Sequence, residues 1–102
     1  MVRIPTHRAP PHPGELLREE FLEPLEMTQT QLAAAIGVPF QRVNDLVNGR
    51  RGITPDTALR LAKLFQTTPD LWLNMQRACD LYDAYRKGAD ALKRIRAIRG
   101  AA

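Results

Sequence analysis

Polar and basic side chains suited to contact nucleic acid gather between residues 41 and 51 of the 102-residue chain. Gln and Asn amides pair bidentately with base edges, a carboxylate accepts a hydrogen bond from cytosine, and arginine holds phosphate. Apolar residues recur at helical spacing at Val43, Leu46 and Val47, so the polar residues share the exposed face. The pattern predicts a DNA-contacting helix. Its candidate contacts are Gln41, Arg42, Asn44, Asp45, Asn48, Arg50 and Arg51.

Three further candidates flank this helix. Thr28 and Gln29 open the preceding predicted helix, whose first backbone amides point at the DNA backbone, so both are expected to contact phosphate. Phe40 lies one turn before Val43, and two positions fit it: the protein core, or the groove against a thymine methyl group.

Two short helices must position these side chains. The first begins at Thr28, an N-cap whose capping-box partner is Gln31, and ends at Gly37. After a turn that closes with Pro39 the second helix runs to about Asn48. A small Ala33, the turn glycine and Val43 then stand at positions 5, 9 and 15 of a window starting at Gln29, which is the spacing of a helix-turn-helix. An ordinary αα-hairpin, which needs the same small residue and turn glycine, is the alternative.

The remaining helix signatures make the fold all-α with five helices, because no alternation of period two marks a strand. An acidic amphipathic helix is predicted from Gly14 to Leu25, limited by Pro24. A fourth helix starts at Thr54, and a fifth starts at Thr68 and runs to a break at Lys87 and Gly88. We therefore divide the chain into a flexible N-terminal arm (1–13), a DNA-binding and dimerisation domain (14–86) and a basic C-terminal tail (87–102). The tail is either a solvated end or an additional nucleic-acid or partner contact.

Protein partners are predicted for two surfaces. A homodimer is expected because operators mirror a two-fold axis of the protein. Its seam is placed on the apolar stripe of the fifth helix, at Leu71, Trp72, Met75, Cys79 and Tyr82. The acidic first helix is either a solvated face or a contact for a basic protein partner, through Glu19, Glu20 and Glu23.

Few residues in the chain are of types that could carry out catalysis. The chain contains no serine, and its metal or nucleophile candidates are His7, His12, Glu15 and Cys79. Two histidines in a proline-rich arm are more often solvated or capping groups, and Cys79 sits on an apolar stripe with no activating base near it in sequence. We expect no enzyme activity, no catalytic residue, no metal and no cofactor.

Charge and hydropathy indicate that this is a cytoplasmic protein that binds anionic molecules. The net charge is +4 and the pI about 9.8, which favours anionic partners without identifying one. One cysteine excludes an intrachain disulfide, and no apolar run approaches the roughly 18 residues of a membrane span. We expect no membrane association.

Three sequence blocks, HPGELLREEFLEPL, NGRRGITPDTALRLAKLF and PDLWLNMQ, resemble the HigA-type antitoxins of the XRE helix-turn-helix superfamily. The resemblance covers about residues 10 to 82 and implies a five-helix, lambda-repressor-like bundle. It also implies an antitoxin that neutralises a RelE-like (HigB-type) mRNA-cleaving toxin and represses its own operon by binding double-stranded operator DNA. A stand-alone XRE-type repressor with no toxin partner is the alternative.

Overall fold

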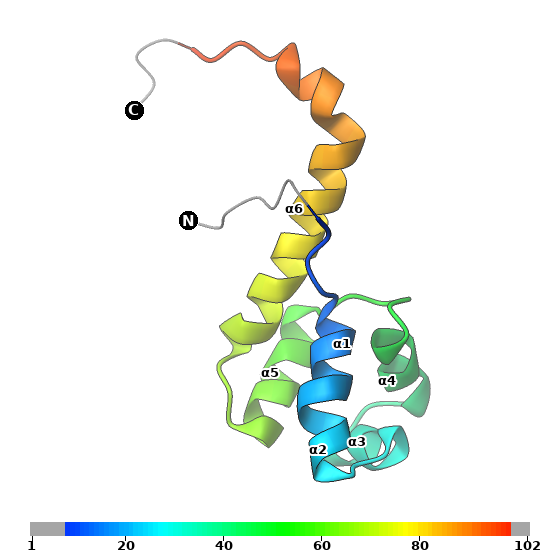
Figure 1. Cartoon of the computed structure of the whole chain (residues 1–102). Coiled ribbons are helices and arrows are strands. Elements are labelled where there is room, and N and C mark those ends of the chain that lie inside the picture. Colours follow the sequence, from blue (N-terminus) through cyan, green and yellow to red (C-terminus); the bar gives the residue numbers. More distant parts are fainter. Residues whose placement is uncertain (1–7, 99–102) are drawn as a thin grey trace.

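A computed structural model of the chain describes residues 8–98. These residues form helices and no strand (Figure 1). The predicted first helix runs without interruption through three segments, α1 (Pro13–Leu16), η1 (Leu17–Leu22) and α2 (Glu23–Leu25). It is followed by α3 (Gln29–Ile36), α4 (Phe40–Val47), α5 (Pro55–Phe65) and α6 (Pro69–Lys93). The all-α, five-helix prediction is therefore confirmed.

The first helix widens into a π-helical turn at η1, which the sequence analysis did not anticipate. The backbone N–H of Glu23 donates to the carbonyl of Arg18, five residues back. Pro24 follows at once, and a proline has no N–H and would clash with the carbonyl four residues before it in an α-helix. The wide turn lets Pro24 stay within the helix, which ends one residue later because Glu26 takes a left-handed conformation with φ of 52°.

One hydrophobic core holds the helices together. Trp72, Leu17, Leu32 and Leu61 are fully buried in it. Phe21 of the first helix packs against α5 and α6: its ring centroid lies 4.5 Å from that of Phe65 and 5.3 Å from that of Trp72. Such tilted aromatic pairs stabilise by about 0.5–1.5 kcal/mol beyond the area they bury.

The predicted break at Lys87 and Gly88 is wrong. Helix α6 continues through both residues to Lys93, and its outer part stands away from the rest of the fold (Figure 1). An isolated glycine costs a helix only about 1 kcal/mol, and the alanines around Gly88 are the strongest helix formers. The helical part of the proposed tail thus belongs to α6, while residues 99–102 lie outside the described residues.

The end of the predicted arm contacts the rest of the fold. The side chain of His12 accepts a hydrogen bond from the backbone N–H of Gly14 and so caps α1, whose first residue, Pro13, is buried. The Cys79 thiol of α6 lies 3.4 Å from the carbonyl oxygen of Pro11. The arm therefore lies against α6 at Pro10 and Pro11, and Pro13, predicted as its last residue, is instead the first residue of α1. Residues 1–7, including the metal candidate His7, lie outside the described residues.

Candidate DNA-binding surface

Helices α3 and α4 and the turn between them form the predicted helix-turn-helix. Thr28 and Gln31 make both bonds of the capping box, at 3.0 and 2.9 Å. Gly37 ends α3 with φ of 71°, a conformation that glycine adopts without strain. Val43 and Leu46 of α4 are buried. The opposite face of α4 is consequently turned outward.

The outward face of α4 carries a chain of hydrogen bonds among the predicted DNA contacts. Gln41 donates to the Asp45 carboxylate at 2.8 Å, and Arg50 donates to the same oxygen at 3.2 Å. Arg50 also donates to the Asn44 side-chain carbonyl at 3.0 Å, and the Asn44 amide donates to Gln29 at 3.0 Å. Five predicted contacts from α3, α4 and the following loop are thereby joined, and we call them the polar network.

Asp45 is the anionic centre of the polar network. The hydrogen bond from Gln41, and next the hydrogen bond and positive charge of Arg50, hold its pKa below the ordinary value of 3.8 despite partial burial. Asp45 is therefore ionised at neutral pH and accepts from both neighbours. Gln41 keeps its side-chain carbonyl and its second N–H, which are the two groups that a bidentate contact with adenine uses.

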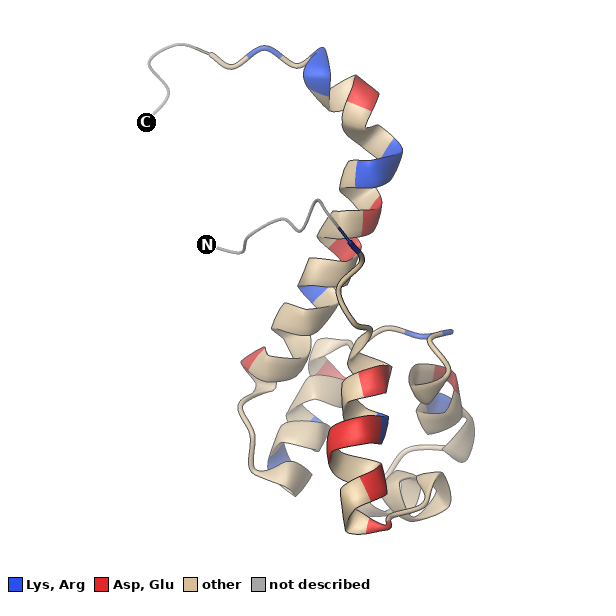
Figure 2. Cartoon of the chain, in the orientation of Figure 1, with Lys and Arg blue, Asp and Glu red and all other residues tan. Residues whose placement is uncertain are grey.

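The other predicted contacts fall around the polar network. Phe40 is exposed over 47% of its surface, so the core position is excluded and the outward one remains. Asn48, Arg50 and Arg51 lie exposed in and after the turn that ends α4, where Gly49 has φ of 76°. Figure 2 shows basic positions at this loop and acidic positions along the first helix. Thr28 is exposed at the start of α3.

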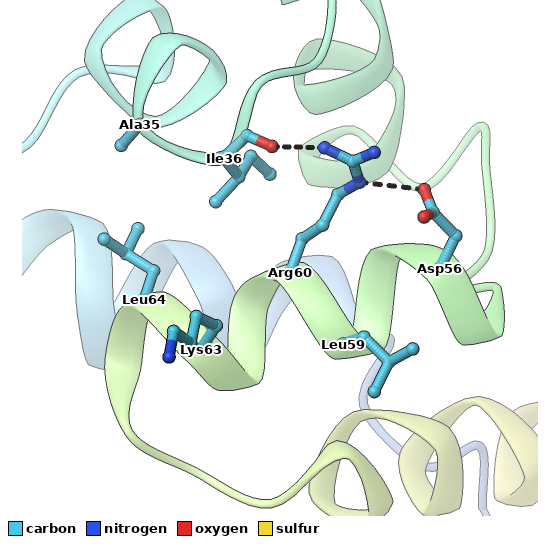
Figure 3. Close-up of a pocket in the computed structure, with 7 residues that line it drawn as sticks. All are labelled: Ala35, Ile36, Asp56, Leu59, Arg60, Lys63 and Leu64. Atoms are coloured by element: carbon cyan, nitrogen blue, oxygen red, sulfur yellow. Dashed lines mark hydrogen bonds and ion pairs between the residues drawn. The ribbon is translucent and has the colours of Figure 1, made fainter.

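Two supporting residues were missed by the sequence analysis. Arg60 of α5 donates to the carbonyl of Ile36 at 2.7 Å, at the end of α3, and to Asp56 at 3.0 Å (Figure 3). Asp56 also accepts from Arg42 of α4 at 3.2 Å. Arg60 and Asp56 thus connect α5 to both helices of the motif, and Arg42, expected to contact phosphate, is already paired with a carboxylate. The i,i+4 spacing of Asp56 and Arg60 is that of an ion pair on one helix face, but no local pattern indicates their contacts with α3 and α4.

A third missed residue, Gln76, fixes the loop after α4. Its side-chain carbonyl accepts from the Ile53 backbone N–H at 2.8 Å. A Cβ at Gly52 would lie within 2.9 Å of the Gln76 side chain, so glycine allows this close approach. Gln76 lies on the long helix α6, 23 residues from Ile53, where no local pattern indicates its role.

The predicted dimer seam needs correction at two residues. Trp72 is fully buried in the protein's own core and donates through its indole N–H to Thr67 at 2.9 Å. Tyr82 is only 9% exposed, with the Arg86 guanidinium 5.6 Å from its ring centroid. Neither offers a free surface: Trp72 lies on the side of α6 that packs into the core, and Tyr82 is buried. Leu71 is 37% exposed, and Met75 and Cys79 are half-buried.

The acidic side chains predicted to meet a partner are exposed. Glu19, Glu20 and Glu23 all lie on the outside of the first helix. Glu23 is 3.8 Å from Arg18, an exposed pair of the kind that contributes little to stability.

The enzyme candidates make structural contacts. His12 is a helix cap, and burial raises the pKa of the Cys79 thiol, an effect that the carboxylates of Asp80, Asp83 and Glu15 increase. A raised pKa keeps the sulfur protonated and weakly nucleophilic at neutral pH. Residues 8–98 bring together no group of three His, Cys, Asp or Glu residues arranged to hold a metal ion. Within the same residues, no helix is both long and apolar enough to cross a bilayer.

Two short helices joined by a glycine turn, with a polar outward face on the second, define the helix-turn-helix class. The helix-turn-helix family HTH_3 matches residues 18–72. Antitoxin HigA-1 of Vibrio cholerae is 39% identical over 93 residues, which are 91% of this chain and 88% of that protein. Virulence-associated protein I of Dichelobacter nodosus is 51% identical over 70 residues, covering 69% of this chain but only 65% of its own length.

A solved structure agrees with these relatives. The structure of the Pseudomonas aeruginosa antitoxin HigA with the higBA promoter matches with a TM-score of 0.83 and 38% identity, over 87% of this chain and 98% of that chain. The chain belongs to the XRE helix-turn-helix family, in its group of HigA-type antitoxins. The resemblance and the fold class inferred from the sequence are thereby confirmed, and the family is one of DNA-binding regulators and antitoxins.

Proposed function

We propose that this protein is a cytoplasmic antitoxin that represses its own operon by binding double-stranded operator DNA. The observation that carries the proposal is the polar network, which arranges amides, a carboxylate and an arginine on the outward face of α4. Side chains held in one arrangement before binding lose less conformational freedom when they meet the DNA. Membership of a family whose Pseudomonas aeruginosa representative is solved with a promoter supports the same role.

The structure supports a division of labour among the predicted contacts. Gln41 reads a base edge, because its carbonyl and second N–H remain available beyond its bond to Asp45. Asn44 uses its carbonyl for Arg50 and one N–H for Gln29, so it positions those two side chains. The Phe40 ring touches a thymine methyl group, a role that its exposure supports. Phosphate contacts come from Thr28, Gln29, Arg42, Asn48, Arg50 and Arg51.

The second half of the proposed function is neutralisation of a RelE-like, HigB-type toxin that cleaves mRNA. A ribonuclease that grips RNA phosphates presents a basic surface, and the exposed Glu19, Glu20 and Glu23 offer the complementary charge. Changing these three residues together to Gln should slow association with the toxin and flatten its dependence on salt. An unchanged association rate in a folded variant would remove this face as the contact.

DNA binding is tested with the full chain and a duplex from the region upstream of its own gene. Fluorescence anisotropy at fixed salt should show binding about 1,000-fold or more tighter than to a scrambled duplex. As a proposed homodimer, the protein should protect an inverted repeat whose half-sites are about 10 bp apart, or a multiple of that. Toxin binding is tested by co-purification with the product of the neighbouring gene. Operator binding without a toxin partner would reduce the function to that of a stand-alone repressor.

A further inference from the structure

Residues 48–53, which follow α4, carry three of the predicted phosphate contacts, and we call this segment the basic loop. Near its start, the backbone N–H of Arg50 donates to a carbonyl of α4 at 2.8 Å, and the Arg50 side chain belongs to the polar network. At its end, the side chain of Ile53 is buried in the core, and the Ile53 backbone N–H donates to Gln76 of α6. Arg51 lies exposed between these two anchors.

The side-chain amide of Gln76 is held in one orientation by α6 itself. Its N–H donates to the Asp80 carboxylate at 2.9 Å, one helical turn further along the same helix. A carboxylate accepts hydrogen bonds and has none to donate, so the nitrogen of the amide faces Asp80 and the carbonyl oxygen faces the other way. That oxygen accepts from the Ile53 N–H at 2.8 Å. The basic loop therefore meets a fixed acceptor on α6.

Gly52 leaves the space that this contact needs. A Cβ at Gly52 would lie 2.8 Å from the side-chain oxygen of Gln76 and 2.9 Å from the carbon and nitrogen of the same amide. The backbone of Gly52, unlike that of Gly49 with φ of 76°, does not take the left-handed conformation that favours glycine. The close approach of the Gln76 side chain is therefore the reason for a glycine at this position.

We propose that Gln76 is a positioning residue for DNA binding, which acts by holding the basic loop where Arg51 meets a phosphate. This inference rests on the proposed DNA binding and adds a determinant of its affinity. Without the acceptor on α6, the Ile53 N–H loses its partner and the basic loop loses one of its two anchors. Arg51 must then be ordered when the DNA binds, which costs affinity. Arg50 keeps its own bonds to α4.

The first test is Gln76→Met in the full-length protein, which removes the acceptor but keeps the length of the side chain and its preference for helix. Anisotropy titrations with cognate and scrambled duplexes at several salt concentrations provide the measurement. The dissociation constant should rise by about 3- to 10-fold on both duplexes alike, with a smaller salt slope and an unchanged preference for the cognate sequence. Wild-type affinity in this variant would overturn the inference.

A double-mutant cycle with Arg51→Ala separates positioning from a general weakening of the fold. If Gln76 acts through Arg51, then Gln76→Met should change the affinity by less than about 2-fold once Arg51 has been replaced by Ala. Circular dichroism on the same samples establishes that each variant is folded at the temperature of the titration. An equal loss of affinity in the wild-type and Arg51→Ala backgrounds would overturn the inference, because it would show that Gln76 supports the fold as a whole.

An exchange of the amide and the carboxylate provides a rescue at constant net charge. In the double variant Gln76→Glu/Asp80→Asn, the carboxylate at position 76 accepts from the Ile53 N–H and from the amide at position 80. This variant should bind DNA within about 2-fold of the wild type. Gly52→Ala, which drives the Gln76 amide away from Ile53, should instead weaken binding as Gln76→Met does. An exchange variant as weak as Gln76→Met, or a Gly52→Ala variant of wild-type affinity, would contradict the inference.

The same titrations distinguish failure of this inference from failure of the proposed function. Phosphate contacts act on any sequence, so the effect of Gln76→Met is measurable on the scrambled duplex even without a preference for the operator. A wild-type chain that binds both duplexes equally would contradict operator recognition alone. A wild-type chain that prefers its operator, beside a Gln76→Met variant of the same affinity, would overturn the role of Gln76 and leave operator recognition standing.

Discussion

Replacing Gln41 by Ala is the substitution that separates base reading from general attraction to DNA. A bidentate amide contact with adenine discriminates by about 1–3 kcal/mol. Because only one N–H of Gln41 is engaged, by Asp45 at 2.8 Å, the groups that make this contact need not be released first, and the full range is expected. The variant should therefore bind the cognate duplex about 5- to 150-fold more weakly.

The fold should tolerate this substitution, since Gln41 is exposed. Anisotropy titrations at several salt concentrations, with cognate and scrambled duplexes, provide the measurement. Affinity for the scrambled duplex and the slope against salt should remain those of the wild type, because no phosphate contact is lost. Asn74→Ala, which removes an exposed amide from α6, is the matched control and should change neither affinity. Equal weakening on both duplexes would refute the base-reading role.

Four further outcomes follow from the contacts described. Arg51→Ala should weaken binding to every duplex alike and lower the salt slope by about 1; altered sequence preference would show instead that it reads bases. Trp72→Ala should lower the free energy of unfolding by about 3–5 kcal/mol in chemical denaturation, and a loss below 1 kcal/mol would contradict its full burial. Gly14→Ala should lower the free energy of unfolding by about 1–3 kcal/mol, since a Cβ at this position overlaps the carbonyl of Leu46. An unchanged thermal midpoint would contradict the close contact between α1 and α4. In an NMR titration, the Asp45 carboxyl should titrate with a midpoint below 3.8, and this midpoint should rise in Gln41→Ala, which loses the hydrogen bond to Asp45. Because the pKa of Asp45 is lowered by folding, its contribution to stability is present above pH 3.8 and is lost as the pH falls through the pKa of the folded protein. A wild-type midpoint at the ordinary value would contradict the polar network.

The sequence predicted those features that short-range rules determine. The caps at Thr28, Thr54 and Thr68 and the turn at Gly37 are local signals, and the helices begin and end where these residues indicated. The helix through Gly88 was missed because a glycine signals a helix end only when no strong helix formers surround it.

Long-range contacts explain the rest of what the sequence did not predict. The face of Trp72 was assigned from its spacing alone, but which side of an apolar helix is buried depends on where α5 and the first helix pack. Likewise, the candidate contacts on α4 could be chosen from residue type, whereas the bonds that join them could not. Arg60 reaches a carbonyl 24 residues away, and Gln76 reaches a backbone amide 23 residues away.

The central claim is that the outward face of α4 recognises one DNA sequence. The most direct measurement is a footprint and titration of the full chain on the region upstream of its own gene, in competition with scrambled DNA at physiological salt. The account predicts a protected inverted repeat and a preference of about 1,000-fold or more for that repeat. Equal affinity for both DNAs, with no protected repeat, would contradict it.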